Sequence, residues 1–174
     1  MTIGCVDCHS QGVNNPSSPT WMSGYVKGGP NGVFQIGPFT TYTANLTPDI
    51  ETGLGKNTDR QVYNALKWGL TPDMPDAVIT AGVPGQGNFP AQPHFLAPPM
   101  PWTSTRHLSD DDLWSLVAYI KHGVKAVANA VPDSQGPPDF WAGSYTADKV
   151  GPYPLPAYPA ASEQVAPQAV LAPR

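Results

Sequence analysis

Two cysteines and a histidine near the N-terminus have the spacing C-x-x-C-H. They are Cys5, Cys8 and His9, within the stretch GCVDCHS, and the chain has no other cysteine. Covalent attachment of a c-type haem requires this arrangement. Two thiols add to the two vinyl groups of the porphyrin, and the histidine that follows binds the iron on its proximal side. The motif therefore predicts one covalent haem c with His9 as the proximal ligand.

Other uses of a C-x-x-C pair agree less well with the sequence. A thioredoxin-like redox motif lies in a βαβ pattern, and no such pattern follows Cys8. A zinc site needs two further ligands at short spacing, but no third cysteine is available. A disulfide between Cys5 and Cys8 is chemically possible, yet it gives no role to the adjacent His9.

The second axial ligand of such an iron must come from a distant part of the chain. Methionine or histidine can supply it, and the candidates are Met22, Met74, Met100, His94, His107 and His122. Met100 lies between prolines in LAPPMPW, so its backbone is stiff and its sulfur is presented at a small entropic cost. Methionines more often fill gaps in a core than bind iron, and Met74 and His94 remain rivals to Met100.

A first helix is predicted within residues 55–69, in GKNTDRQVYNALKWG. Thr58 or Asn57 can cap its start, and Gly69 suits the left-handed conformation that often follows a helix end. Apolar residues recur on one face of this segment, which indicates that it packs on a core.

A second and stronger helix is predicted over residues 108–123, in LSDDDLWSLVAYIKHG. Ser109 is the expected N-cap, with Asp112 three residues later, where a capping box places its acid. A third helical patch is predicted over residues 124–131.

The composition predicts few helices and long irregular connections. The chain has 22 prolines and 17 glycines, and only 13 % of its residues are charged, against a usual share of about 25 %. Residues 11–37 and 71–102 are expected to be loops. A large rigid cofactor can supply the core for such a chain.

The last part of the chain differs in composition from the rest. We expect residues 1–131 to form a mono-haem domain and residues 132–174 to form a proline-rich extension. Its aromatic stretch, residues 140–158, is expected to be an extended arm that packs on its own domain or on a partner. For the last dozen residues a disordered tail is equally expected.

Two long blocks of sequence resemble a known family. They are PFTTYTANLTPDIETGLGKNTDRQVYNALKWG, residues 38–69, and PPMPWTSTRHLSDDDLWSLVAYIKHG, residues 98–123. Together with the C-x-x-C-H motif they resemble the class I cytochrome c domains of the alcohol-dehydrogenase cytochrome subunit type. The resemblance covers the larger part of the chain.

The resemblance implies an all-α class I cytochrome c fold with His9 and Met100 as axial ligands. It also implies that Pro38 offers its carbonyl to the proximal histidine. The other residues that it implies at the haem or its propionates are Tyr42, Asn45 and Trp102.

Two features depart from the family pattern. Only four residues precede Cys5, where the family has a helix, and the loop of residues 71–98 is longer than the family's.

No secretory leader precedes the motif, although haems of this kind are attached after export in bacteria. We therefore expect a periplasmic protein whose leader or anchor lies upstream of this numbering. No apolar run of about 18 residues predicts a membrane span.

These expectations together predict electron transfer. Two strong axial ligands leave no coordination position for a small-molecule substrate at the iron. The net charge of −4 argues against a nucleic-acid partner. The 9 Lys and Arg residues are spread along the chain with no cluster beside the haem motif or Met100, whereas a freely diffusing carrier usually has a charged docking face. We expect a docked subunit of a membrane-bound redox complex that is respiratory, photosynthetic or built on a dehydrogenase, with the C-terminal arm in the contact.

Two alternatives remain at this stage. One is a gas sensor or a peroxidase-like enzyme with a weak sixth ligand, although a di-haem peroxidase would need a second C-x-x-C-H motif. The other is a structural subunit whose haem does not change its oxidation state.

Overall fold

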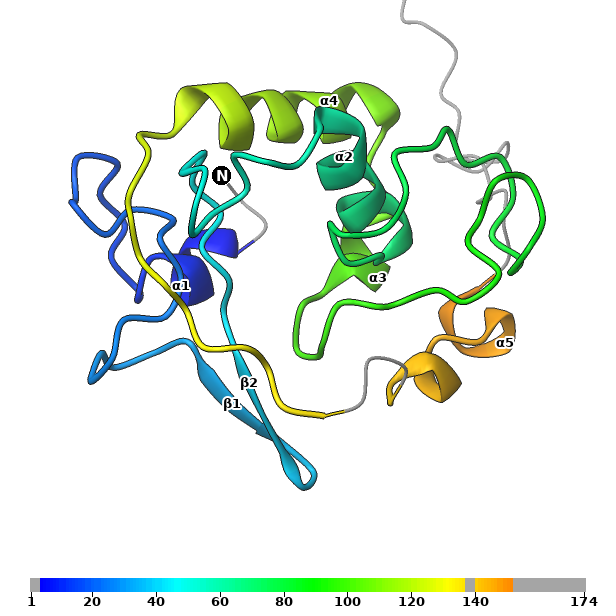
Figure 1. Cartoon of the computed structure of the whole chain (residues 1–174), viewed down its shortest axis with the longest axis horizontal. Helices are drawn as coiled ribbons and strands as arrows, with labels where there is room; N and C mark the ends of the chain where they lie inside the picture. The colour runs from blue at the N-terminus through cyan, green and yellow to red at the C-terminus, as the bar shows by residue number, and fades with distance from the viewer. Residues whose placement is uncertain (1–3, 137–139, 152–174) are drawn as a thin grey trace, which may run out of the picture.

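The structure is a computed structural model that describes residues 4–136 and 140–151 (Figure 1). Its elements, in chain order, are α1 (Cys5–His9), β1 (Val33–Ile36), β2 (Phe39–Tyr42), α2 (Asp59–Trp68), α3 (Trp102–Thr105), α4 (Asp110–Ala118), the π-helical turn η1 (Tyr119–Gly123), the 3₁₀ turn η2 (Ala142–Ser144) and α5 (Ala147–Val150). Long loops connect these short elements, as the proline and glycine content predicts. Helix α4 runs along one edge of the molecule beside α2, and α1 lies on the other side from α2 and α3 (Figure 1).

Helix α2 has the ends that its sequence predicts. The Thr58 hydroxyl accepts a hydrogen bond from the Gln61 backbone N–H at 3.1 Å, and the Gln61 side chain accepts one from the Thr58 N–H at 2.9 Å. This reciprocal pair satisfies two backbone donors that a helix start otherwise leaves unpaired. Gly69 ends the helix with φ of 71°, which a residue with a Cβ adopts at a cost. The choice between Thr58 and Asn57 as N-cap is therefore settled.

Helix α4 also begins where the sequence predicts. The Ser109 hydroxyl accepts a hydrogen bond from the Asp112 N–H at 3.1 Å. The helix continues directly into η1, so the predicted segment of residues 108–123 is helical almost throughout. Leu113 and Val117 are almost completely buried, which places this face of α4 in the core beside α2.

The prediction of an all-α fold is not confirmed, because the chain forms a small antiparallel sheet. Strands β1 and β2 pair from Val33 with Tyr42 to Ile36 with Phe39. Gly37, with φ of 57°, and Pro38 form the turn between them. Aromatic and β-branched residues in both strands favour an extended backbone, and the intervening Gly-Pro pair supplies the turn.

The prediction of a helix over residues 124–131 is wrong, because this segment has no regular secondary structure. Two threonine hydroxyls of a preceding loop bind its backbone. The Thr47 hydroxyl accepts from the Val127 N–H at 3.1 Å, and the Thr52 hydroxyl accepts from the Asn129 N–H at 2.9 Å. These side chains take the donors that a helix would use internally.

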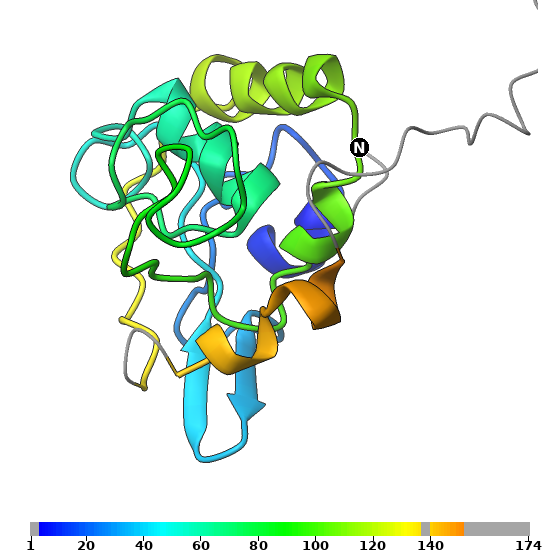
Figure 2. The same cartoon turned by 90° about the vertical axis from the view of Figure 1, so that its right-hand side faces the viewer.

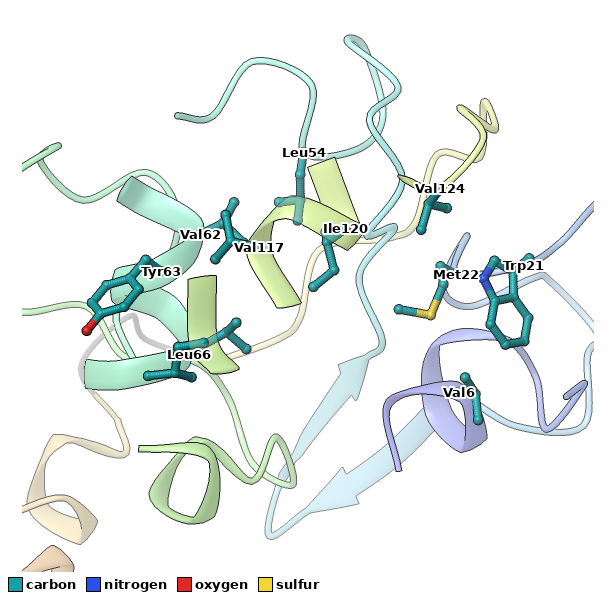
Figure 3. Packing of buried hydrophobic residues seen from close by; sticks show 11 residues of the cluster. Val6, Trp21, Met22, Leu54, Val62, Tyr63, Leu66, Val117, Ile120 and Val124 are labelled. Atoms are coloured by element: carbon teal, nitrogen blue, oxygen red, sulfur yellow. The ribbon is translucent and has the colours of Figure 1, made fainter. Parts of the chain in front are cut away.

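The buried apolar residues form two groups. The first, called here the helix cluster, lies between α1, α2 and α4 and consists of Val6, Trp21, Met22, Leu54, Val62, Tyr63, Leu66, Leu113, Val117, Ile120 and Val124 (Figure 3). The second, called here the aromatic cluster, consists of Trp68, Leu70, Ile79, Phe89, Phe95, Trp102 and Trp141. The helix cluster draws on three helices, whereas the aromatic cluster gathers residues from the end of α2 and from the segments that follow it.

The described part of the C-terminal extension runs back along the body of the molecule. The Gln135 N–H donates to the Thr40 carbonyl at 2.8 Å, beside strand β2. Residues 140–151 then lie beside the loops that follow α2 (Figure 2). The rest of the predicted arm, including Tyr153 and Tyr158, and the predicted tail lie outside the described residues. Among the described helices, none is long and apolar enough to cross a membrane.

Candidate functional site

Helix α1 brings the three residues of the C-x-x-C-H motif together. Cys8 and His9 lie three and four residues after Cys5, so all three share one side of this short helix. The two thiols are not joined to each other, and both are half-buried. Burial raises the pKa of both thiols, and the neighbouring charge of Asp7 adds to the effect at Cys8. Neither thiol is tied up in a disulfide, which attachment through two thioether bonds requires.

His9 is held in one orientation by a backbone carbonyl. Its Nδ1 lies 2.7 Å from the carbonyl oxygen of Ala44. A carbonyl can only accept, so Nδ1 carries the proton and Nε2 keeps its lone pair. The side chain is 8 % exposed, and burial lowers the pKa of the imidazole, which favours this neutral tautomer. Among the described residues, none forms a hydrogen bond with Nε2. An imidazole whose other nitrogen donates to a carbonyl is the usual form of a metal ligand, so His9 fits the proximal role.

The carbonyl that accepts from His9 is not that of Pro38, so this expectation was wrong. Pro38 lies exposed in the turn between β1 and β2, at the far end of the hairpin from α1 (Figure 1). The hairpin carries the Gly37–Pro38 pair away from His9, and the chain returns to α1 only after β2. Ala44, two residues beyond the end of β2, supplies the acceptor instead.

A second loop fixes the position of the Ala44 carbonyl. The Gly24 N–H donates to the His9 carbonyl at 2.9 Å, and the Tyr25 N–H donates to the Thr43 carbonyl at 2.9 Å. The Thr43 hydroxyl also reaches the carbonyl of Cys8 at 3.2 Å. A Cβ on Gly24 would lie 2.5 Å from the backbone of Ala44, and Gly24 has φ of 78°. The sequence predicted neither Ala44 nor Gly24. Any residue can offer a backbone carbonyl, so residue type does not identify Ala44, and the close packing that requires Gly24 depends on the distant Ala44.

Met100 lies at the edge of the helix cluster. Its side chain is half-buried and packs against that cluster, as does Cys5. The Met100 N–H donates to the Ala97 carbonyl at 3.2 Å, and the Thr41 hydroxyl donates to the Pro98 carbonyl at 3.1 Å. The first contact forms a tight turn, and the second attaches that turn to strand β2.

The rival ligands lie in different surroundings. Met74 packs against the aromatic cluster rather than the helix cluster that Cys5 borders. The His94 ring lies 4.0 Å from the carboxylate of Asp73. Met22 is completely buried, and its N–H donates to the hydroxyl of Ser10, next to His9, at 2.8 Å. Figure 3 shows Met22 beside Val6 of α1, so it lies on the His9 side of the site.

The three residues implied to line the haem are spread over the structure. Tyr42 pairs with Tyr25, with ring centroids 5.2 Å apart. Both ends of the Asn45 amide bind the protein: its Nδ2 donates to the Val127 carbonyl at 2.8 Å, and its Oδ1 accepts from Thr47. Trp102 is buried in the aromatic cluster. The structure does not bring these three side chains together, and their contact with a haem stays a prediction.

Curated relatives share much of this sequence. The chain is 35 % identical over 100 residues, or 56 % of its length, to the cytochrome c subunit of alcohol dehydrogenase (quinone) from Gluconobacter oxydans. It is 32 % identical over 133 residues, or 76 % of its length, to the gluconate 2-dehydrogenase cytochrome c subunit from Pantoea cypripedii. It is 30 % identical over 140 residues, or 80 % of its length, to the fructose dehydrogenase cytochrome subunit from Gluconobacter japonicus.

This chain is a cytochrome c resembling those subunits. No protein-family profile matches it. The chain spans about a fifth of the length of these relatives, since the matches cover 17 %, 23 % and 23 % of them. The cofactor that this cytochrome implies is haem c, which agrees with the free thiols and the single tautomer of His9 on α1.

Proposed function

We propose that this cytochrome transfers electrons through one covalent haem c whose axial ligands are His9 and Met100. The observation that carries the proposal is the bond from His9 Nδ1 to the Ala44 carbonyl, which leaves the other nitrogen free for iron. Met100 is favoured over Met74 because it borders the same cluster as Cys5, whereas Met74 borders the other one.

Each of these residues has a defined task. Cys5 and Cys8 hold the porphyrin, and the haem when bound supplies a one-electron redox centre. The Ala44 carbonyl keeps the His9 ring in one tautomer and raises its basicity toward a metal. The Met100 thioether favours ferrous iron and so raises the reduction potential. With protein ligands on both sides, substrate has no position at the iron, which favours an electron carrier over a gas sensor or peroxidase.

The partner that we propose is the catalytic part of a dehydrogenase. The relatives are named as cytochrome subunits of alcohol, gluconate and fructose dehydrogenases. The few, unclustered Lys and Arg residues favour a fixed subunit over a diffusing carrier. We infer a periplasmic, membrane-bound complex in which residues 1–131 form the haem domain and the extension contributes to docking. Haem reduction by such a dehydrogenase should then need the dehydrogenase substrate and change little with salt.

Visible spectroscopy of ligand variants tests the axial pair. We expect the ferric wild-type protein to show low-spin bands together with the weak far-red band of a sulfur–iron bond. Met100→Ala should lose that band and become high-spin, with carbon monoxide binding in the ferrous state. Met74→Ala is the matched control, because it removes a half-buried methionine from the aromatic cluster. Loss of the band in Met74→Ala and its survival in Met100→Ala would overturn the assignment.

The haem count needs a separate measurement. Intact mass under denaturing conditions should give the chain plus one haem, because Cys5 and Cys8 form its sole C-x-x-C-H motif. A mass without haem would overturn covalent attachment.

A further inference from the structure

Residues 140–151, called here the C-terminal segment, contact the loop that carries Met100 (Figure 2). That loop, residues 95–101, is called here the methionine loop. It has no helix or strand of its own beyond an isolated bridge between Phe95 and Leu70. Its position therefore depends on the groups that bind it from outside.

Two aromatic side chains of the C-terminal segment bind successive carbonyls of the methionine loop. The Trp141 indole N–H donates to the Phe95 carbonyl at 3.2 Å. The Tyr145 hydroxyl lies 3.5 Å from the Leu96 carbonyl, at the outer limit of a hydrogen bond. Trp141 is 5 % exposed and belongs to the aromatic cluster, so its bond is shielded from water.

The same segment also holds the chain on the other side of Met100. The Tyr145 ring meets Trp102 edge to face, with centroids 4.9 Å apart. Arg106, directly after α3, donates from its guanidinium to the Val150 carbonyl at 3.2 Å. The C-terminal segment thus touches residues before and after Met100 and bridges the ends of the turn that presents its sulfur.

We propose that Trp141 and Tyr145 are positioning residues that keep the methionine loop closed and so keep the Met100 sulfur on the iron. This inference rests on the proposed function, because it takes Met100 to be the sixth ligand. It gives the described part of the extension a role inside the cytochrome itself, besides any contact with a partner.

The proposal predicts a competition that can be measured. An external ligand such as imidazole reaches the ferric iron only when the methionine loop opens and the sulfur leaves. The apparent affinity for imidazole therefore reports the population of the open loop. Contacts that close the loop should weaken imidazole binding, and their loss should strengthen it.

The test is an imidazole titration of the ferric holoprotein in four forms. Trp141→Phe keeps an aromatic ring but removes the donor to the Phe95 carbonyl, and Tyr145→Phe removes the hydroxyl. Ser144→Ala is the matched control, because Ser144 lies in the same segment and is exposed, whereas the neighbouring Phe140 ring packs on Trp141 at 5.3 Å.

We expect Trp141→Phe to raise the apparent imidazole affinity about tenfold. The variant leaves the Phe95 carbonyl buried without its donor in the closed loop, and this cost shifts the equilibrium between closed and open loop by about a factor of ten. Tyr145→Phe should raise it about two- to threefold, because its bond is longer. Ser144→Ala should stay within about twofold of the wild type, because surface substitutions of this kind usually have small effects. Hydrogen exchange at the Leu96 amide, which donates to the Gly69 carbonyl at 2.7 Å, should become faster in Trp141→Phe.

The outcomes separate this inference from the proposed function. If the wild-type protein shows the sulfur–iron band and both variants bind imidazole as it does, the positioning role is overturned and Met100 ligation stands. If the wild-type ferric protein lacks the band, Met100 ligation is overturned, and the positioning role falls with it. An equal gain of affinity in Ser144→Ala would also overturn the inference, because that change leaves the rings and donors of Trp141 and Tyr145 in place.

Discussion

The α1 side and the methionine side of the proposed haem site are held by different kinds of contact. On the α1 side, His9 follows Cys8 directly. The Gly24 N–H donates to the His9 carbonyl, and the His9 ring donates to the Ala44 carbonyl. On the methionine side, one backbone bond joins Leu96 to Gly69, and side chains of distant residues such as Thr41 and Trp141 donate to the loop's carbonyls.

The difference has a physical consequence. Backbone contacts between adjacent loops are dense and independent of residue type, so single substitutions on the α1 side matter mostly where a side chain would clash. A loop that is held by a few side-chain donors loses its position when one donor is removed. The structure therefore suggests a fixed proximal side and an adjustable methionine side, and four predictions test this contrast.

The largest effect should follow from removing both thiols. The double variant Cys5→Ala, Cys8→Ala should retain no haem after denaturation, because no other cysteine can form the bond. Haem staining of a denaturing gel measures this loss. Asp7→Asn, an exposed change between the two cysteines, should keep the stain. A stained double variant would show that attachment does not depend on the motif.

Gly24→Ala should be the most destabilising single change on the α1 side. The new Cβ would meet the Ala44 backbone, and φ of 78° strains any residue with a side chain. We expect a loss of about 3 kcal/mol or more in the free energy of unfolding.

Gly28→Ala is the matched control for that change. Gly28 has nearly the same φ, 79°, but nothing lies within 4 Å of its added Cβ. Gly28→Ala should therefore lower the free energy of unfolding by about 1 kcal/mol, from backbone strain alone. Urea unfolding of both variants measures the difference, and equal losses would remove close packing against Ala44 as the cause.

Thr41→Val should loosen the methionine side. Thr41 is 3 % exposed, and the change leaves the Pro98 carbonyl without its hydroxyl donor. We expect a loss of about 1–2 kcal/mol in the free energy of unfolding, together with a weaker sulfur–iron band. Thr40→Val, whose hydroxyl donates to the exposed Gln35 side chain, should change neither quantity. Should Thr41→Val leave the band unchanged, the methionine loop would be less adjustable than the contrast requires.

The smallest change in stability should follow from breaking a contact between α2 and α4, which belongs to neither the α1 side nor the methionine side of the proposed site. The Tyr63 hydroxyl donates to Asp110 at 2.7 Å, and this bond, together with Lys67, lowers the pKa of the carboxyl. The folded state thus favours the ionised form, and this stabilisation is present above the ordinary pKa of aspartate. It is lost as pH falls through the lowered value.

Asp110→Asn should therefore cost a few tenths of a kcal/mol at neutral pH, since the carboxylate is largely solvated. The cost should vanish in acid, and the haem spectrum should not change. Urea midpoints from pH 7 to pH 3 measure this, with Asp111→Asn as a control of equal charge. A spectral change in Asp110→Asn would couple α4 to the iron and contradict the separation.

Local signals in the sequence predicted the local parts of the fold. Thr58 with Gln61 and Ser109 with Asp112 carry the cap chemistry of their own helices, and both helices begin at these residues. The segment 124–131 was predicted wrongly because its conformation depends on threonines about 80 residues earlier in the chain. The hairpin was missed because four-residue strands give too short a pattern for periodicity to show.

The sequence by itself determined the chemistry at α1, because C-x-x-C-H places two thiols and an imidazole on one helical turn whatever the rest of the chain does. Only the tertiary structure decided which carbonyl faces His9, since every residue has a carbonyl and nothing in residue type marks Ala44. It also decided that Trp141 donates to the carbonyl of Phe95 in the methionine loop, although Phe95 comes much earlier in the chain. Contacts of this kind depend on how the loops close in space, and no short pattern of residues encodes them.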